Sequence, residues 1–144
     1  MRHYAKRRLC QTRPVRRSLS SAYTIIERQI GESTERRAAE ALNEKCRNGT
    51  QPTWLRRWQQ YDRSSKADCM GVDFIFFTDV GRIFLNTKSS TVFAKAFELA
   101  GNRNIVTAVV DVRKDLDGIY QDIIGPVAKR RDEIIAYRAK RHAQ

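Results

Sequence analysis

Residues 72–88, VDFIFFTDVGRIFLNTK, form the clearest β pattern in the chain. Segments 72–78 and 82–87 are rich in Val, Ile and Phe, and DVG at 79–81 separates them, as expected for two strands joined by a turn. Large apolar residues occupy both faces of both strands. We therefore expect this hairpin to lie deep in a sheet that is covered on both sides.

Two elements are expected before the hairpin. Apolar residues recur every three or four positions over residues 20–46, which predicts a helix. Gly31 either kinks this helix or divides it into two shorter ones. Residues 53–61, with two Trp and one Tyr, predict a strand, and a short helix is the alternative.

Three or four further elements are expected after the hairpin. Ser89 or Ser90 caps a helix that ends at Gly101. Residues 105–112 predict a buried strand, and Gly125-Pro126 is expected to break the last helical segment in two. The predicted order is αβββαβα, an α/β (α+β) fold in which helices flank a central mixed sheet of about four strands.

The net charge of +12 lies almost entirely in two terminal segments. Residues 1–20 hold seven Lys or Arg and no acid, and residues 129–144 hold six against two acids. We therefore expect a basic arm at 1–20, an α/β core at 21–128 and a basic C-terminal helix at 129–144. Basic ends on a balanced body are typical of proteins that bind nucleic acid, although they can also serve solubility alone. The candidate phosphate contacts are Arg7, Arg8, Arg16, Arg17, Lys129, Arg130 and Arg131.

The cysteines and histidines exclude several classes of chemistry. Cys10, Cys46 and Cys69 are odd in number and widely spaced, which argues against a disulfide framework and a structural zinc site. A cytoplasmic or nucleoid location fits best, and we favour an uncleaved basic arm over an organelle transit peptide. His3 and His142 lie in the terminal segments, where neither is well placed to serve as a catalytic base. Any catalysis would then depend on carboxylates, lysine and a metal.

The hairpin can bring an acid, an amide and a lysine together, because residues two apart on a strand share a face. A two-residue Val80-Gly81 loop would place Asp73 opposite Lys88 and Ile75 opposite Asn86. A three-residue loop over 79–81 would instead place Asp73 opposite Thr87. The sequence leaves both registers open.

Gly71-Val72-Asp73 and, 13 positions beyond Asp73, Asn86-Thr87-Lys88 together resemble the core signature of the PD-(D/E)XK superfamily. This superfamily includes restriction endonucleases and Holliday-junction resolvases, and its core of helix, three antiparallel strands, helix and strand is similar to the order predicted above. Its first helix often carries a glutamate a few residues after a glycine. Gly31 and Glu35 match this pattern, and Glu32 is the second match. The resemblance covers about residues 21–112.

The resemblance implies a role for each matched residue. Asp73 would be the central ligand of Mg²⁺ or Mn²⁺, with the Thr87 carbonyl as a further ligand. Glu35 would bind a metal directly or through water, and Lys88 would orient the attacking water or stabilise the charged phosphate. Asn86 stands where the family usually has Glu, Asp or Gln, and its neutral amide would weaken the attraction for a divalent cation.

The resemblance implies a metal-dependent nuclease that hydrolyses phosphodiester bonds in DNA. The alternative is a catalytically degenerate nucleic-acid-binding or assembly module on the same restriction-endonuclease-like scaffold. A third hypothesis is a basic RNA-binding protein. DNA is the expected partner and RNA the alternative, and a homodimer is compatible with the resemblance. No membrane partner is expected, because the chain has no apolar run of about 18 residues.

Overall fold

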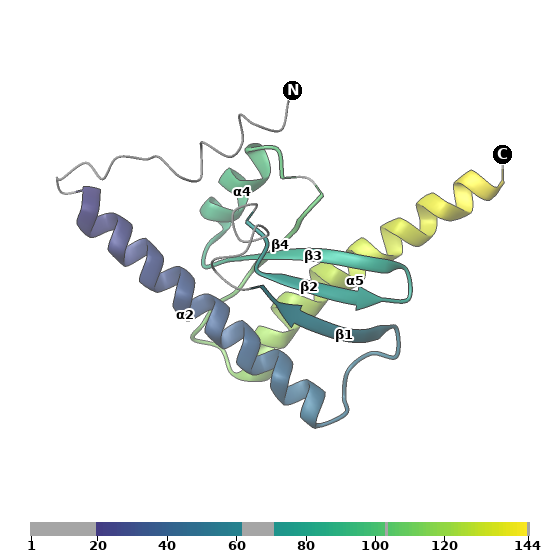
Figure 1. Ribbon diagram of the computed structural model, residues 1–144, viewed down its shortest axis with the longest axis horizontal. Coiled ribbons are helices and arrows are strands. Elements are labelled where there is room, and N and C mark those ends of the chain that lie inside the picture. The colour runs from purple at the N-terminus through teal and green to yellow at the C-terminus, as the bar shows by residue number, and fades with distance from the viewer. Residues whose placement is uncertain (1–19, 62–70, 103, 144) are drawn as a thin grey trace.

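The computed structural model describes residues 20–61, 71–102 and 104–143, with side chains from residue 25 onward. This part of the chain has an α+β fold with four strands and three helices, and the αβββαβα order is confirmed (Figure 1). The predicted basic arm, with Arg7, Arg8, Arg16 and Arg17, lies outside the described residues, as do His3, Cys10 and Cys69. The elements are α2 (Ser20–Arg47), β1 (Leu55–Gln60), β2 (Phe74–Thr78), β3 (Gly81–Lys88), α4 (Thr91–Leu99), β4 (Val106–Val109) and α5 (Leu116–His142).

The four strands form one mixed sheet in the order β1-β2-β3-β4. The β1–β2 and β2–β3 pairs are antiparallel, and β4 runs parallel to β3. A parallel pair needs a crossover, and α4 supplies it. Ser90 caps α4 as predicted, because its side chain accepts a hydrogen bond from the Phe93 N–H. Residues 53–61 contain a strand and no helix, so the predicted first strand is also confirmed.

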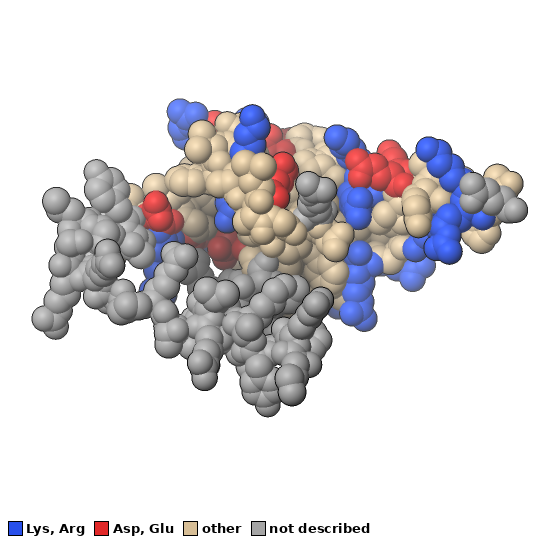
Figure 2. Space-filling model, turned by 90° about the horizontal axis from the view of Figure 1, so that it is seen from above, with Lys and Arg blue, Asp and Glu red and all other residues tan. Residues whose placement is uncertain are grey.

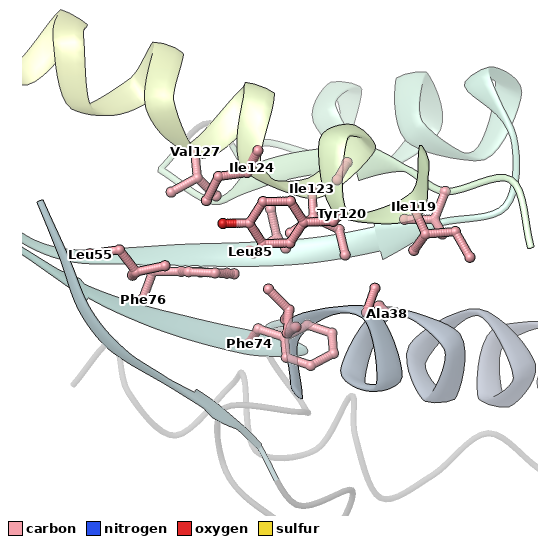
Figure 3. Close-up of a cluster of buried hydrophobic side chains, with 14 of the residues drawn as sticks. Ala38, Leu55, Phe74, Phe76, Leu85, Ile119, Tyr120, Ile123, Ile124 and Val127 are labelled. Carbon is pink, nitrogen blue, oxygen red and sulfur yellow. The ribbon is translucent and has the colours of Figure 1, made fainter. Parts of the chain in front are cut away.

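Helices α2 and α5 pack on one face of the sheet and on each other (Figure 3). Phe74, Phe76 and Leu85 point from the sheet into this layer and are completely buried. They meet small or branched side chains of the two helices, including Ala38, Ala41, Leu42, Ile119, Ile123 and Val127. Full burial of a Phe or Leu side chain contributes roughly 1.5–3 kcal/mol, so this layer is the main source of stability. Ile75, which alternation directs to the opposite face, is also buried, but Phe77 and Phe84 on that face are only half-buried. The expectation of a sheet covered on both sides is therefore met only in part.

The turn between β2 and β3 differs from both predicted registers. Thr78 pairs with Gly81, so the loop is Asp79-Val80, and Phe74 pairs with Leu85. The Thr78 hydroxyl stabilises this turn by donating to the Gly81 carbonyl at 2.7 Å and accepting from the Val80 N–H. Gly81 has a φ of 115°, which only glycine adopts readily, and therefore serves as the first residue of β3. Placing Gly81 in the loop was the error in both predictions.

The predicted break at Gly125-Pro126 is also wrong. Helix α5 continues for 27 residues with Pro126 inside it. Its buried stripe includes Ile123 and Ile124 before the proline and Val127 after it. Contacts on both sides of Pro126 thus hold the helix together although proline cannot donate the hydrogen bond of its turn. Helix α2 similarly continues through Gly31 as one helix of 28 residues.

Both long helices extend past the sheet, α2 at its N-terminal end and α5 at its C-terminal end (Figure 1). The C-terminal part of α5 carries many of the Lys and Arg residues that are visible at the right of Figure 2. Among the described residues, no helix contains an apolar stretch long enough to cross a bilayer.

Replacing Pro126 by Ala should raise the free energy of unfolding by about 1–3 kcal/mol, because alanine restores a backbone donor inside a continuous helix. Gly125→Ala is the matched control. A Cβ at Gly125 would meet nothing within 4 Å, so this substitution should add only about 0.5–1 kcal/mol. Urea unfolding of the three proteins measures both effects. A destabilised Pro126→Ala protein would contradict a continuous α5.

Candidate functional site

A cleft of about 330 Å³ lies between the N-terminal half of α2, the end of β3 and α4. Four of the five residues predicted from the nuclease-like motif line it, namely Glu35, Asp73, Thr87 and Lys88. They come from three separate segments of the chain. The structure therefore brings together most of the predicted constellation, although the strand register is not the one expected.

Asp73 occupies the place where a main-chain partner of β3 is missing. Strand β2 begins at Phe74, whereas β3 continues to Lys88. The Thr87 N–H donates to Asp73 Oδ2 at 2.6 Å, and the Thr87 hydroxyl donates to the same oxygen at 2.9 Å. Both residues are buried. The carboxylate thus caps the sheet at this point and is held firmly at the wall of the cleft.

Asn86 is the predicted site residue that is not among those lining the cleft. Its Nδ2 donates to the Gly71 carbonyl at 2.5 Å, which orients the amide. Its Oδ1 is buried and accepts no hydrogen bond from any described residue. Thr107, its pairing partner on β4, also has a buried Oγ1 without a described partner. The expectation that Asn86 opposes Ile75 is wrong, because Ile75 pairs with Phe84.

Gly71 fixes the local backbone beside Asn86. Its φ of 81° lies in the left-handed region, and a Cβ there would be 2.5 Å from the Phe97 ring. Any larger residue would therefore clash and be strained. The glycine of the sequence motif has a structural role here, because it lets α4 approach β3 closely.

Lys88 is half-buried at the end of β3, and its Nζ lies 4.9 Å from the centroid of the Phe97 ring. No hydrogen bond or ion pair joins this ammonium group to another described residue. The ring restricts its position without neutralising its charge. Lys88 is therefore a cation at the cleft that can still bind an anion.

Glu35 reaches the cleft from α2, one helical turn after Gly31. Nothing lies within 4 Å of the position that a Cβ at Gly31 would take, so this residue leaves the cleft open beside the glutamate. The neighbouring Thr34 is buried and satisfies its hydroxyl by donating to the Ile30 carbonyl. Glu32, the second match of the motif, does not line this cleft and instead borders a separate hollow along α2.

The oxygen ligands that line the cleft are of the kind that a hard divalent cation binds. Asp73 and Glu35 offer carboxylate oxygens, and Mg²⁺ usually binds one or two carboxylates together with phosphate oxygens of the substrate. The Thr87 N–H points toward β2, and the carbonyl of the same residue points the same way in a strand. Within the described ranges no cluster of three or more His, Cys, Asp or Glu could hold a metal. The cleft is thus suited to a cation that a substrate helps to bind.

Sequence reasoning missed the apolar wall of the cleft. Ile30 from α2 and Phe93 and Phe97 from α4 line it together with the polar groups. Ile30 and Phe93 are also more than two-fifths exposed. The four-residue spacing of the two phenylalanines was a usable signal, because it places both rings on one face of a helix.

The three predicted phosphate contacts on α5 differ in whether an acidic side chain of the protein already binds them. Arg131 Nε and Nη2 donate to the two carboxylate oxygens of Asp79 at 2.8 and 2.6 Å, so this side chain clamps the β2–β3 turn. Arg138 donates to the Val80 carbonyl of the same turn at 2.7 Å. Arg130 pairs with Glu133, whereas Lys129 is exposed. Arg131 therefore has a structural role that its place in a charged run did not indicate.

No protein-family model, curated protein or solved structure matches the chain. The PD-(D/E)XK resemblance therefore stays a prediction, and the function has to be argued from the cleft itself.

Replacing Asp73 by Ala should lower the free energy of unfolding by about 1–3 kcal/mol, because the buried Thr87 N–H loses its acceptor. Asp73→Asn should lose less, since its amide oxygen can still accept. Thr87→Val, which removes the hydroxyl and leaves the N–H, provides the matched control for the second hydrogen bond. Chemical unfolding measures the free energy of unfolding of each variant. An Asp73→Ala protein as stable as the unmodified protein would contradict this role.

The clamp at the turn predicts a dependence of stability on pH. The hydrogen bond from Arg131 lowers the pKa of Asp79 below its ordinary value of 3.8. The pair then stabilises the fold above that value, and its contribution is lost as the pH falls through the lowered pKa. The stability difference between the unmodified protein and Asp79→Asn should therefore be constant from pH 7 to about pH 5 and shrink in more acidic solution. A constant difference down to pH 2 would contradict the clamp.

Proposed function

We propose that the chain is a metal-dependent nuclease-like protein that hydrolyses phosphodiester bonds in DNA, with a restriction-endonuclease-like core. The observation that carries this proposal is the convergence of Glu35, Asp73, Thr87 and Lys88 on one cleft. Two carboxylates and an ammonium group together can serve both a cation and a phosphate. This combination is what hydrolysis of a phosphodiester by water requires.

Asp73 and Glu35 would hold Mg²⁺ or Mn²⁺, with the Thr87 carbonyl as a further ligand. Such a cation supplies Lewis acidity at the phosphate oxygen and lowers the pKa of a bound water. The hydrogen bonds from Thr87 hold the Asp73 carboxylate in one position, so little reorganisation is needed on binding.

Lys88 would bind the scissile phosphate. During water attack, negative charge builds up on the oxygens around phosphorus, and a fixed ammonium group beside them stabilises the transition state more than the ground state. The Phe97 ring next to Lys88 restricts the motion of its side chain. The same ammonium can also orient the attacking water by hydrogen bonding.

A specific observation favours a second candidate, a module on this scaffold that binds nucleic acid without cutting it. Asp73 Oδ2 already accepts two hydrogen bonds, and the Asn86 amide is held by Gly71 away from the cleft. The cation would then have fewer protein ligands than the sequence motif suggested. Binding of a polyanion by Lys88 and the basic surface does not require that cation.

Lys88→Ala should lower the rate of DNA cleavage by about 10²- to 10³-fold, the usual cost of removing one group that stabilises transition-state charge. Asp73→Asn keeps a hydrogen-bond acceptor but loses the negative charge, so it should also abolish metal-dependent cleavage. Lys95→Ala, which removes an exposed lysine from α4, is the matched control and should cleave normally. Supercoiled, linear and branched DNA and an RNA of matched length, each with Mg²⁺ or Mn²⁺, serve as substrates.

Cleavage that survives in both Lys88→Ala and Asp73→Asn would overturn the nuclease proposal. Binding of DNA without cleavage by the unmodified protein would favour the second candidate. A preference for RNA that neither substitution alters would support the third hypothesis, an RNA-binding protein.

A further inference from the structure

Three side chains form a row across the strands on the sheet face opposite the α2–α5 core. Arg57 of β1 pairs with Phe77 of β2, which pairs with Arg82 of β3. Phe76 points into the core, so alternation places Phe77 and its two partners on the other face. Both arginines are exposed. We call these residues the Arg57–Phe77–Arg82 row.

A β-bulge places Arg57 in this row. Leu55 pairs with Thr78 and Arg57 with Phe77, so Arg56 is an extra residue in β1. Without the bulge, Arg56 would oppose Phe77, and Arg57 would point into the core beside Phe76. The bulge therefore keeps Leu55 in the core while directing a guanidinium onto the outer face, a change of direction that bulges commonly provide.

No acidic side chain among the described residues neutralises the charges of the row. The Arg57 guanidinium lies 3.7 Å from the centroid of the Phe77 ring, and the Arg82 guanidinium lies 5.8 Å from it. Neither arginine forms an ion pair or side-chain hydrogen bond with another residue in the described ranges. Arg131, in contrast, is fully engaged by Asp79. The row thus presents two guanidinium groups whose hydrogen-bond donors remain available.

We propose that the Arg57–Phe77–Arg82 row binds a nucleic-acid strand with unpaired bases. A guanidinium plane that stacks on a ring can accept a base on its outer side, and stacking needs a base whose face is exposed. The donors at the edge of each guanidinium suit phosphate oxygens. Duplex DNA offers phosphates but no exposed base faces along its length, so it should bind the row less well.

The row lies close enough to the cleft to position a substrate there. Phe77 of β2 is four residues from Asp73, which directly precedes this strand, and four residues of extended chain span about 13 Å. A strand of a few nucleotides can therefore occupy both places. This inference gives the proposed nuclease a preference for unpaired DNA, but binding by the row itself needs neither a cation nor cleavage.

The test measures binding in EDTA, where hydrolysis cannot contribute, by fluorescence anisotropy of a labelled 20-nucleotide oligodeoxythymidine. Arg57→Ala and Arg82→Ala should each weaken binding by roughly tenfold, as expected for the loss of one stacking or phosphate contact. Each should also reduce the slope of log K against log salt by about 0.7 if the lost group neutralised one phosphate. The expected order of affinity for the unmodified protein is single strand above a duplex of equal length.

Arg57→Lys separates stacking from charge. Lysine keeps the positive charge but lacks the plane, so the salt slope should stay near that of the unmodified protein while affinity for the single strand falls. Lys95→Ala removes one exposed charge from α4 and should change affinity by less than about twofold. Circular dichroism and thermal unfolding would confirm that each variant is folded.

Three results would overturn the inference. One is equal weakening by Lys95→Ala and Arg82→Ala, which would indicate attraction by net charge alone. Another is tighter binding of duplex than of single strand with no effect of Arg57→Lys. The third is binding to anionic phosphatidylserine vesicles but not to the oligonucleotide. If the row binds as expected but no cleavage occurs with Mg²⁺, the nuclease proposal fails and this inference stands.

Discussion

Because a two-residue turn pairs Thr78 with Gly81, β3 runs three residues past the point where β2 begins. This overhang exposes the Thr87 N–H on the side where a strand partner would be, and the Asp73 carboxylate takes that place. The same overhang brings Lys88 beside α4 and leaves Asn86 to bind the Gly71 carbonyl. The positions of Asp73, Thr87 and Lys88 at the cleft therefore follow from one hairpin register, whereas α2 positions Glu35.

The order of elements could be predicted because each depends on local signals. Dense runs of large apolar residues specify β2 and β3, and Ser90 and Gly101 bound α4. The register could not be predicted, because a loop containing a glycine is normally placed around it, whereas Gly81 here begins a strand. The continuation of α5 through Pro126 could not be predicted either, because local sequence rules place a helix end or kink at a proline. Buried contacts of Ile123 and Val127 outweigh the missing hydrogen bond there.

Motif spacing was enough to predict that four residues converge on one site, because an error of one residue in the strand register does not separate them. These residues are Glu35, Asp73, Thr87 and Lys88. All four lie near one end of the sheet whichever register holds. The side-chain direction of Asn86 does depend on the register, since a shift of one residue turns a side chain to the other face of the sheet. Its amide is oriented by Gly71, and that contact depends on the left-handed backbone at the glycine. Sequence spacing contains no information on such a contact.

The sequence also could not show which basic side chains are available for binding. A count of charges does not distinguish an arginine that is paired with an acid from one that is not. Arg131 lies in the basic C-terminal segment, yet Asp79 binds it through two hydrogen bonds. Arg82 lies in the balanced body of the chain and has no acidic partner among the described residues. What an arginine side chain can bind depends on which of its N–H donors are still unpaired after folding. For Arg57 and Arg82, strand pairing and a β-bulge determine this rather than composition. Among the described residues, the density of basic residues in the sequence therefore does not indicate which arginines keep unpaired donors.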